Sequence, residues 1–254
     1  DKTILLRQHP APGANIRQAG EDLQPGVEAL PAGTLLRPAQ LALLASLGIA
    51  EVKVFRRLRV AFFSTGDELR PLGSTLEAGQ IYDSNRYALQ GMLQRLGCEI
   101  LDLGRILDNP EHLEKTLQQA AGMADLVIST GGVSVGDADY IAELLGRIGS
   151  INFWKMNMKP GRPLAFGQLG EATFFGLPGN PVSTMVTFYQ FVQPCILKRM
   201  GKSAPWTPTV FKIPLAHSLK KKPGRTDFQR GVLISGENGL QVAGVGQQAS
   251  HIMS

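Results

Sequence analysis

The strongest constraint on the fold is an alternation of short apolar runs with longer amphipathic segments between residues 58 and 147. Each apolar run stops at glycine or polar turn residues, which is typical of buried strands, and each longer segment carries apolar residues on one helical face. The pattern predicts strands at 58–64, 98–103 and 125–129, and helices at 83–95, 110–121 and 138–147. Because strands joined through helices pair in parallel, we expect a three-layer α/β fold with helices on both faces of a parallel sheet.

The sequence on either side of this alternation predicts smaller, β-rich pieces. Prolines and glycines are closely spaced through residues 1–40, which favours short strands and turns, followed by a helix over 39–47 that ends at Gly48. Downstream, strands are predicted at 153–156, 164–166, 173–177, 210–213, 231–234 and 240–245, with one long helix from 180 to about 200. We therefore divide the chain into the end of an N-terminal or linker region (1–54), an α/β domain (55–205) and a partial C-terminal β domain (206–254).

Composition excludes several classes of protein. With 43% hydrophobic and 19% charged residues, and no apolar run near the ~20 residues of a bilayer span, the 254-residue chain is expected to be globular and to lack a membrane segment. The formal net charge of +5 is spread along the chain, which favours anionic small molecules over nucleic acid as ligands. Two cysteines and four scattered histidines form neither a disulfide framework nor a four-ligand zinc site, and they fit a cytoplasmic protein. Because the first methionine is Met92, we also expect a piece of a longer protein.

The segment 125–139 runs from a buried strand through glycines into a helix, and three known loop motifs come close to it. The glycine spacing of the dinucleotide-binding motif is missing, and the P-loop requires lysine where Asp137 stands. The stretch Gly132–Gly136 does match the nucleophile elbow of α/β-hydrolases around Ser134, and a simple tight turn is a further alternative. We favour a phosphate-binding loop, because backbone N–H groups and a helix N-terminus would face the same anion.

Charged residues near this loop favour the same interpretation. Asp137 and Asp139 follow the glycines, where they either hold Mg²⁺ or cap the next helix. Lys155, Lys159 and Arg162 either form a solvated charge run or line the rim of a packed surface, as their apolar neighbours suggest. Cations and a metal ion close to a glycine loop are typical of a phosphate site.

A second turn, over residues 176–183, also leads into a predicted helix. Asn180 stands at the N-cap position and Pro181 at the first helical position, where its missing N–H costs nothing. The turn is therefore either an ordinary helix cap or a second anion-binding helix N-terminus.

Seven motifs occur in a fixed order along nearly the whole chain. They are NIRQAGED (15–22), STGDE (64–68), IYDSN (81–85), STGGVSVGDAD (129–139), KPGRP (159–163), GLPGNPVS (176–183) and PGRTDFQR (223–230). In this order they resemble the molybdopterin molybdenumtransferase family of the bacterial MoeA type, which is similar to the E domains of gephyrin and its plant counterpart.

The resemblance implies an enzyme of molybdenum cofactor biosynthesis. Such a transferase takes adenylylated molybdopterin and molybdate as substrates, uses Mg²⁺, and inserts molybdenum into the dithiolene with release of AMP. The family also implies a homodimer, four domains of which the third would be complete here, and a molybdopterin adenylyltransferase as a partner that supplies the substrate.

The same resemblance implies a set of site residues. Acids that would bind Mg²⁺ and act in catalysis match Glu68, Asp108 and Asp139, and catalytic lysines match Lys155 and Lys159. A phosphate of the substrate is expected on the 130–136 loop, with Ser134 donating a hydrogen bond rather than attacking. The residues expected to contact pterin, phosphate or molybdate are Thr130, Gly131, Gly132, Ser134, Gly136, Pro178, Gly179, Asn180, Pro181, Arg230 and Ser250, with Asp22 also linked to the cleft.

Three alternatives stay open at this stage. A molybdopterin adenylyltransferase would share the α/β domain but would lack the motifs at 15–22 and 223–230. A non-catalytic molybdopterin-binding scaffold would release no AMP, and a serine hydrolase would use Ser134. We also expect this chain to bind the pterin without completing the reaction, because Arg230 and Ser250 lie on a β module with too few strands to close.

Overall fold

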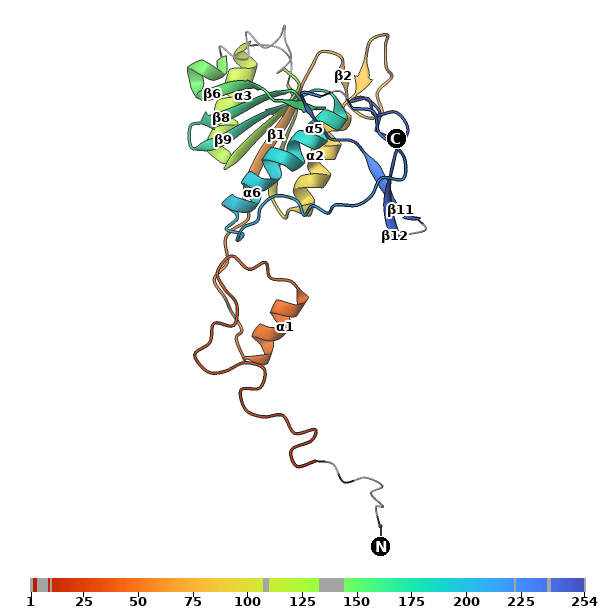
Figure 1. The fold of residues 1–254 in the computed structure, drawn as a ribbon. Helices are drawn as coiled ribbons and strands as arrows, with labels where there is room; N and C mark the ends of the chain where they lie inside the picture. The colour runs from red at the N-terminus through yellow and green to blue at the C-terminus, as the bar shows by residue number, and fades with distance from the viewer. Residues whose placement is uncertain are drawn as a thin grey trace. The chain divides into compact units, whose positions relative to one another are not determined.

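The computed structural model describes residues 2–3, 9, 11–106, 110–132, 144–221, 223–236 and 239–253 (Figure 1). Contacts divide the chain into two compact units, Asp1–Val52 and Lys53–Ser254. In the first unit, helix α1 (Pro38–Ser46) begins with proline at its first position and is followed by Gly48 at φ +71°, as expected. The strands expected before α1 are absent from its described residues. Extended runs are interrupted by positive-φ glycines at Gly13, Gly20, Gly26 and Gly33.

A six-stranded sheet forms the centre of the second unit, in the order β4-β1-β5-β9-β8-β6. Its strands are β1 (Arg59–Thr65), β4 (Glu99–Ile106), β5 (Leu126–Thr130), β6 (Ser150–Lys155), β8 (Pro163–Leu169) and β9 (Ala172–Leu177). The four neighbours β4, β1, β5 and β9 are parallel, which confirms the predicted parallel core.

Strand β8 departs from the prediction, because it runs antiparallel to both β9 and β6. A tight hairpin at Gly170 and Glu171 joins β8 directly to β9, and so short a connection permits only antiparallel pairing. Because β6 is antiparallel to β8 and β8 is antiparallel to β9, β6 runs in the same direction as β9. The carboxyl end of β6 therefore lies at the same sheet edge as the ends of β1, β5 and β9.

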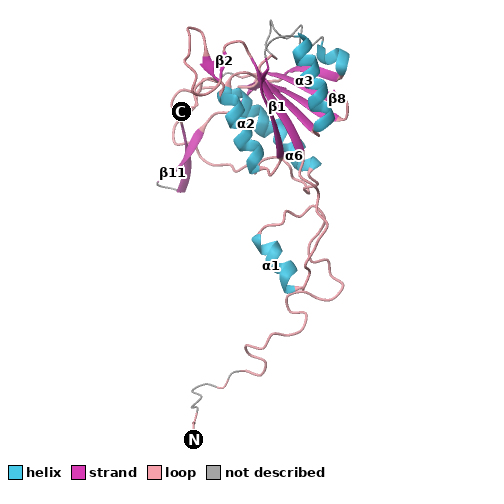
Figure 2. Cartoon of the chain, turned by 180° about the vertical axis from the view of Figure 1, so that it is seen from behind, coloured by secondary structure: helices cyan, strands magenta, loops and turns pink. Residues whose placement is uncertain are grey.

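Helices cover both faces of the sheet (Figure 2). Alternate residues of β1 point to opposite faces: Phe62 packs under α2 (Ser84–Arg95) and α5 (Pro181–Thr187), and Phe63 packs under α3 (Pro110–Met123). Residues 144–148 are also helical and bury Leu144 and Leu145 on the α3 face. The start of that helix, predicted at 138, lies outside the described residues.

The long helix predicted from 180 to 200 is present but contains a π-helical turn. After α5 the chain continues as η1 (Phe188–Val192) and then α6 (Gln193–Arg199). Pro194 cannot donate to the carbonyl of Gln190 and its ring would crowd that carbonyl in a regular α-helix. The wider π turn, in which the N–H of Gln193 donates to the carbonyl of Phe188, stands at this point.

The C-terminal segment forms an antiparallel hairpin and contributes one short strand to a pairing with the α/β region. Strands β11 (Gly231–Gly236) and β12 (Gly239–Gly244) were predicted at 231–234 and 240–245, and they pair with each other. The strand expected at 210–213 is wrong: those residues form no ladder, and Val210 and Phe211 are exposed between Pro208 and Pro214, two residues that cannot donate to a ladder. Two-residue strands carry no periodicity, so the pairs β2 (Leu69–Arg70) with β3 (Ile81–Tyr82) and β7 (Met158–Lys159) with β10 (Thr226–Asp227) were not predicted. No helix among the described residues has the length and apolar character needed to cross a bilayer.

Candidate functional site

The carboxyl ends of β1, β5 and β9 meet at one edge of the sheet. Ser64 of β1 pairs with Thr130 of β5, which in turn pairs with Leu177 of β9, so the three turns that follow these strands are neighbours. Ligands of open α/β sheets gather at this edge. Two of these turns, 131–132 and 178–181, are the ones that the sequence singled out.

Gly131 is the point of closest approach between these turns. Its N–H donates to the carbonyl of Leu177 at 3.2 Å, and its φ is +84°. A Cβ at Gly131 would clash with the carbonyl oxygen of Thr65, and a Cβ at Gly179 would lie 3.8 Å from the Gly131 Cα. Three backbone segments therefore pack together with no side chain between them, which only glycine permits at position 131.

In the turn over residues 177–180, all four consecutive carbonyls accept hydrogen bonds from inside the protein. In order, their donors are the Gly131 N–H (3.2 Å), Thr184 Oγ1 (2.6 Å), Asn85 Nδ2 (2.6 Å) and the Thr184 N–H (2.9 Å). No described residue accepts a hydrogen bond from the N–H of Gly179 or Asn180, and both residues are exposed. The 177–180 turn thus points its carbonyl oxygens inward, and within the described part of the chain it leaves the N–H groups of Gly179 and Asn180 without an acceptor. This polarity suits an anion.

Ser250 from the C-terminal segment docks at the start of α5. Its carbonyl accepts the Val182 N–H at 3.1 Å, and its Oγ lies 3.2 Å from Asn180 Nδ2. Asn180 is the N-cap residue and Pro181 occupies the first helical position, as predicted, but the Asn180 side chain makes no capping hydrogen bond. That side chain donates to Ser250 instead of accepting from the helix, and Ser250 supplies the oxygen that a cap would provide.

Arg230 is held next to the segment that carries Ser250. Its N–H donates to Gln248 Oε1 at 2.9 Å, its Nη2 donates to the carbonyl of Gln247 at 2.7 Å, and Gln248 Nε2 donates to the Arg230 carbonyl at 2.8 Å. The remaining guanidinium atoms, Nε and Nη1, are buried and have no hydrogen-bond partner among the residues that the structure describes. Buried N–H groups of a cation that lack an acceptor are a candidate anion contact. Arg230 and Ser250 are therefore both anchored by hydrogen bonds, although we expected them on a loosely held module.

The two predicted lysines follow the sheet at its carboxyl edge, in and after β6, and both are exposed. Lys155 ends β6, and Lys159 lies in β7, where its carbonyl accepts the Phe228 N–H at 2.8 Å. A Cβ at Gly161, two residues on, would lie 2.7 Å from Thr187 Cγ2 of α5. The lysine-bearing loop therefore packs on the helix that begins at the 177–180 turn.

Glu68 is the one predicted metal-binding acid among the described residues. It follows β1 and is exposed, with its carboxylate folded over Gly66, where an added Cβ would lie 2.6 Å from Glu68 Oε2. Asp108, Asp139, Ser134 and Gly136 lie outside the described residues, and Asp22 lies in the first unit. Across the described part of the chain there is no group of three or more His, Cys, Asp or Glu residues that could hold a metal ion. The predicted three-acid metal site therefore stays a prediction.

Thr130 is buried, and its hydroxyl donates to Ser64 Oγ at 3.3 Å, so it braces the strand end rather than facing solvent. Sequence reasoning missed Thr184 entirely and included Asn85 only as the last residue of the 81–85 motif. Asp83 of the same motif is the N-cap of α2, since its side chain accepts the Arg86 N–H. The available signal was a polar residue inside an otherwise buried helical segment, and nothing local indicates which carbonyl such a residue contacts.

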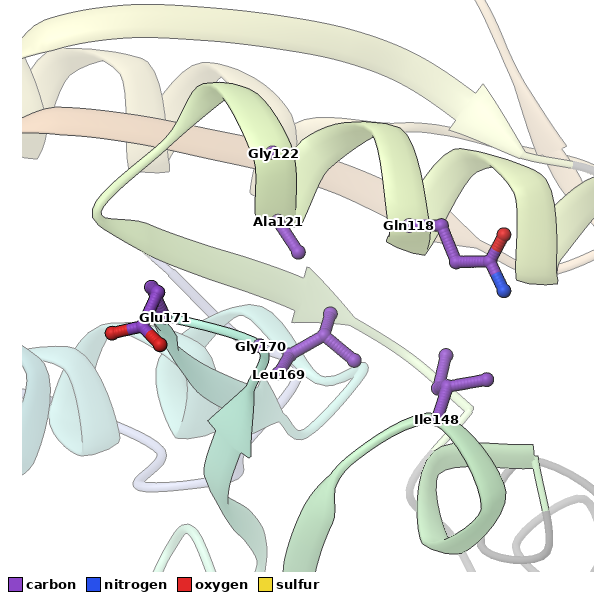
Figure 3. A pocket seen from close by; sticks show the side chains of 7 residues that line it. All are labelled: Gln118, Ala121, Gly122, Ile148, Leu169, Gly170 and Glu171. Atoms are coloured by element: carbon purple, nitrogen blue, oxygen red, sulfur yellow. The ribbon is translucent and has the colours of Figure 1, made fainter.

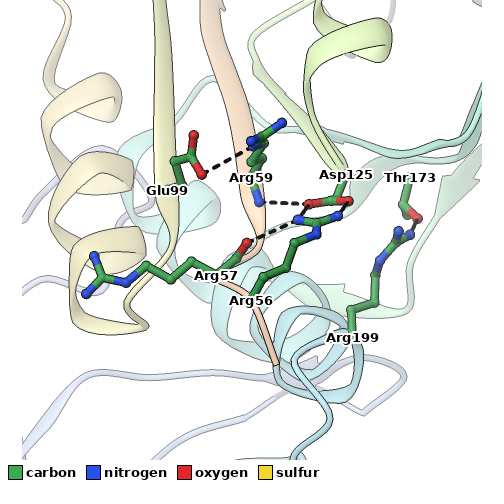
Figure 4. Close-up of polar contacts among 7 residues, drawn as sticks. All are labelled: Arg56, Arg57, Arg59, Glu99, Asp125, Thr173 and Arg199. Carbon is green, nitrogen blue, oxygen red and sulfur yellow. Dashed lines mark hydrogen bonds and ion pairs between the residues drawn. The ribbon is translucent and has the colours of Figure 1, made fainter. Parts of the chain in front are cut away.

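The opposite edge of the sheet holds a charge network, drawn in Figure 4. Asp125, at the start of β5, accepts from Arg56 Nη1 at 2.7 Å and Nη2 at 2.5 Å, and from the Arg59 N–H at 2.8 Å. The Arg56 hydrogen bonds, aided by the Arg59 amide, lower the pKa of Asp125 to about 2 against the opposing effect of burial. This network connects the amino ends of neighbouring strands. It therefore lies at the opposite edge of the sheet from the predicted site residues, which follow the carboxyl ends.

An open cavity of about 440 Å³ lies at this second edge too, between the end of α3 and the β8–β9 hairpin (Figure 3). Its lining is mostly apolar and consists of Gln118, Ala121, Gly122, Ile148, Leu169, Gly170 and Glu171. None of these is a predicted site residue, and the cavity offers no cation for a phosphate.

Comparison with known proteins gives matches over most of the chain. Residues 61–198 match the family described as a probable molybdopterin binding domain, residues 1–48 match the MoeA N-terminal region (domain I and II), and residues 212–254 match the MoeA C-terminal region (domain IV). The molybdopterin molybdenumtransferase of Haemophilus influenzae is 50% identical over 255 residues, covering 100% of this chain and 63% of that protein. Its counterpart in a Nostoc species is 44% identical over 214 residues, covering 83% of this chain and 49% of that protein.

A solved structure gives the same result for the fold. The molybdopterin biosynthesis MoeA protein from Pyrococcus horikoshii superimposes with a TM-score of 0.72 at 29% identity, covering 92% of this chain and 55% of that chain. The chain thus spans between about half and two thirds of the length of the relatives that it matches.

Proposed function

Because this chain belongs to the MoeA family of molybdopterin-binding proteins, we propose that it forms the pterin-adenylate site of a molybdopterin molybdenumtransferase. In this reaction, molybdate is inserted into adenylylated molybdopterin and AMP is released. The observation that carries the proposal is the 177–180 turn at the carboxyl edge of the sheet: its carbonyls all accept hydrogen bonds from inside the protein, and no described residue accepts from the N–H of Gly179 or Asn180. The matches at 1–48 and 212–254 favour this transferase over an adenylyltransferase that has the α/β domain alone.

The chemistry needs stabilisation of developing phosphate charge more than a protein nucleophile. The amides of Gly179 and Asn180 would bind the phosphate, and Lys155 and Lys159 would neutralise the charge that grows as the adenylate bond breaks. Gly131 would let the substrate approach the backbone closely. Ser134 and Gly136 would complete the loop, with Ser134 as a hydrogen-bond donor.

Molybdate is a dianion, and it would be held by Arg230 and Ser250. The unpaired Nε and Nη1 of Arg230 supply two donors, and Ser250 supplies a hydroxyl beside the first turn of α5. Because Ser250 is hydrogen-bonded to Asn180, the last residue of the 177–180 turn, molybdate and the substrate phosphate would bind close together.

Mg²⁺ would be held by Glu68 together with Asp108 and Asp139. The exposed Glu68 carboxylate is a hard oxygen ligand of the kind Mg²⁺ takes, and it follows β1 next to the end of β4, since Thr65 pairs with Ile106. When bound, the ion would neutralise phosphate oxygens of the adenylate. We further propose a cytoplasmic homodimer that receives its substrate from the adenylyltransferase.

A chimera tests the proposed function. The 255-residue segment of the Haemophilus influenzae enzyme that this chain matches would be replaced by this chain, and AMP release from adenylylated molybdopterin would be measured with and without molybdate. We expect molybdate-dependent AMP release by the chimera, with Lys159→Ala lowering the rate by about tenfold or more and exposed Lys220→Ala leaving it unchanged. A folded chimera that binds the substrate but releases no AMP would contradict the proposal.

A further inference from the structure

The side chain of Asn85 reaches from the first turn of α2 to the 177–180 turn. Its Nδ2 donates to the carbonyl of Gly179 at 2.6 Å, across 94 residues of sequence, and Asn85 is only 8% exposed. Its Oδ1 is also buried, and no described residue donates a hydrogen bond to it. A buried polar atom without a partner costs stability, so packing alone does not account for an amide at this position.

The contact fixes the direction of a backbone amide. A trans peptide unit is planar, so its C=O and N–H point in opposite directions. By holding the Gly179 carbonyl inward, Asn85 turns the N–H of Asn180 outward, where no described residue accepts it. Gly179 has no Cβ, so its backbone tolerates many conformations, and this peptide could otherwise rotate.

The other carbonyls of the turn are held by elements that start at or beside it. Gly131, in the loop after β5, donates to the carbonyl of residue 177. Thr184, in the first turns of α5, donates to the carbonyls of residues 178 and 180. Asn85 alone, among the described residues, connects the turn to α2. It is therefore the hydrogen bond that couples the first turn of α2 to the orientation of the anion-binding amides.

We infer that Asn85 is a positioning residue that holds the Asn180 N–H toward the phosphate of the bound substrate. The inference rests on the proposed function, since it assigns to the same site the residue that orients it. Replacement by aspartate is the sharpest test, because Asp has the same shape but sets a carboxylate oxygen against the Gly179 carbonyl. The repulsion would favour rotation of the peptide and would turn the amide away from the anion.

The test uses the 254-residue chain, AMP as the probe and calorimetric titration at a temperature where circular dichroism shows each variant folded. We expect Asn85→Asp to bind AMP at least about tenfold more weakly than wild type, and Asn85→Ala to bind about fivefold more weakly. Gln94→Ala removes an exposed amide side chain from the same helix and should bind like wild type. If Asn85→Asp does not fold, Asn85→Ala carries the comparison.

A second measurement separates positioning from a purely structural role. Addition of AMP should shift the amide NMR resonance of Asn180 in wild type and in Gln94→Ala, and this shift should be lost in Asn85→Asp. Equal AMP affinity and an unchanged Asn180 shift in a folded Asn85→Asp or Asn85→Ala chain would overturn the inference while leaving the proposed function intact. If wild type and Gln94→Ala also fail to bind AMP, both the inference and the proposed site are contradicted.

Discussion

At the scale of single residues, the candidate site depends on buried polar side chains that hold backbone groups. Thr184 is fully buried, and its hydroxyl lies 2.6 Å from the carbonyl of Pro178 and 3.1 Å from that of Asn180. A carbonyl held inward leaves the next amide pointing outward, so Thr184 orients the N–H of Gly179 as Asn85 orients that of Asn180. The exposed, charged residues around the turn can act only if this backbone geometry is kept.

Thr184→Val should therefore lower stability and weaken AMP binding together. Valine has the same shape but no donor, so the buried Pro178 carbonyl loses its partner, at a cost of about 1 to 3 kcal/mol in the free energy of unfolding. Urea denaturation checks this value. The matched control is Thr116→Val on α3, where an exposed hydroxyl bonds the His112 carbonyl and the change should stay within about 0.5 kcal/mol. Equal effects at the two positions would show that the 177–180 turn does not need the threonine.

Local sequence predicts the exposed residues of the site better than the buried residues that hold its backbone in place. Lys155, Lys159, Gly131 and Pro181 were found from turn chemistry and charge, which are properties of neighbouring residues. The contact made by Asn85 was not predicted because its partner is 94 residues away. The hydrogen bonds between Arg230 and Gln248 likewise join residues that are 18 positions apart. Nothing in a local pattern states which distant carbonyl a buried amide will contact.

At the scale of elements, the two sheet edges are built differently. The carboxyl edge is polar backbone and glycine, whereas the amino edge is held by ion pairs at the first residues of its strands (Figure 4). Arg59 also pairs with Glu99 at the start of β4 at 3.2 Å, and Arg199 of α6 donates to Thr173 in β9 at 2.7 Å. This arrangement fixes the starts of four neighbouring strands and leaves their ends free to form a site.

The low pKa of Asp125 predicts acid sensitivity. Its folded pKa of about 2 lies below the ordinary value of 3.8, so the ionised carboxylate stabilises the fold above about pH 4. This contribution is lost as pH falls from about 4 to about 2. Because Arg56 is mostly exposed, we expect only about 1 to 2 kcal/mol after solvent screening.

Asp125→Asn should remove this contribution at neutral pH and flatten the dependence of stability on pH between about 4 and 2. Urea unfolding at a series of pH values measures both effects. Glu99→Gln, in a pair whose side chains are both about half exposed, should change stability by less than about 0.5 kcal/mol. An Asp125→Asn chain with the stability and pH profile of wild type would show that the network does not anchor the strands.

Element prediction succeeded where apolar periodicity was strong and failed where tertiary pairing decides. The buried strands β1, β5 and β9, and helices α2 and α3, follow their predicted spans closely. The antiparallel direction of β8 was missed because a single strand's pattern carries no direction. The absent strand at 210–213 shows the opposite error, since a β-type pattern between two prolines found no partner.

At the scale of the whole molecule, the chain consists of two units that separate after Val52. The family and the α/β fold were predicted correctly from motifs spread along the sequence. The division at residues 54 and 205 into three regions stays a prediction, as does binding of the pterin by this chain without turnover. The hydrogen bonds of Ser250 with Asn180 and Val182 show that the C-terminal segment docks at the start of α5, although its own hairpin has two strands.

Removal of residues 1–52 should leave the second unit folded and able to bind AMP. Every described residue of the carboxyl-edge site belongs to Lys53–Ser254, and its hydrogen bonds are made within that unit. We expect chain 53–254 to keep the circular dichroism of the sheet and to bind AMP within about twofold of the full chain. A large loss of affinity would show that the first unit, which carries Asp22, contributes to the site.

In the proposed function, the glycine-lined carboxyl edge of the sheet binds the pterin adenylate. Calorimetric titration of Gly131→Ala with adenylylated molybdopterin measures whether this edge is the binding site. The added methyl group meets the Thr65 carbonyl at a position with φ +84°, so the turns must separate. Gly97→Ala is the control, because it places the same methyl group at φ +74° in open space.

We predict one substrate site per chain in wild type and in Gly97→Ala. Gly131→Ala should remain folded, with a less stable sheet edge, and should bind the substrate at least about tenfold more weakly. Equal affinity for the substrate in wild type and in a folded Gly131→Ala chain would contradict the account and would place the binding site elsewhere on the molecule.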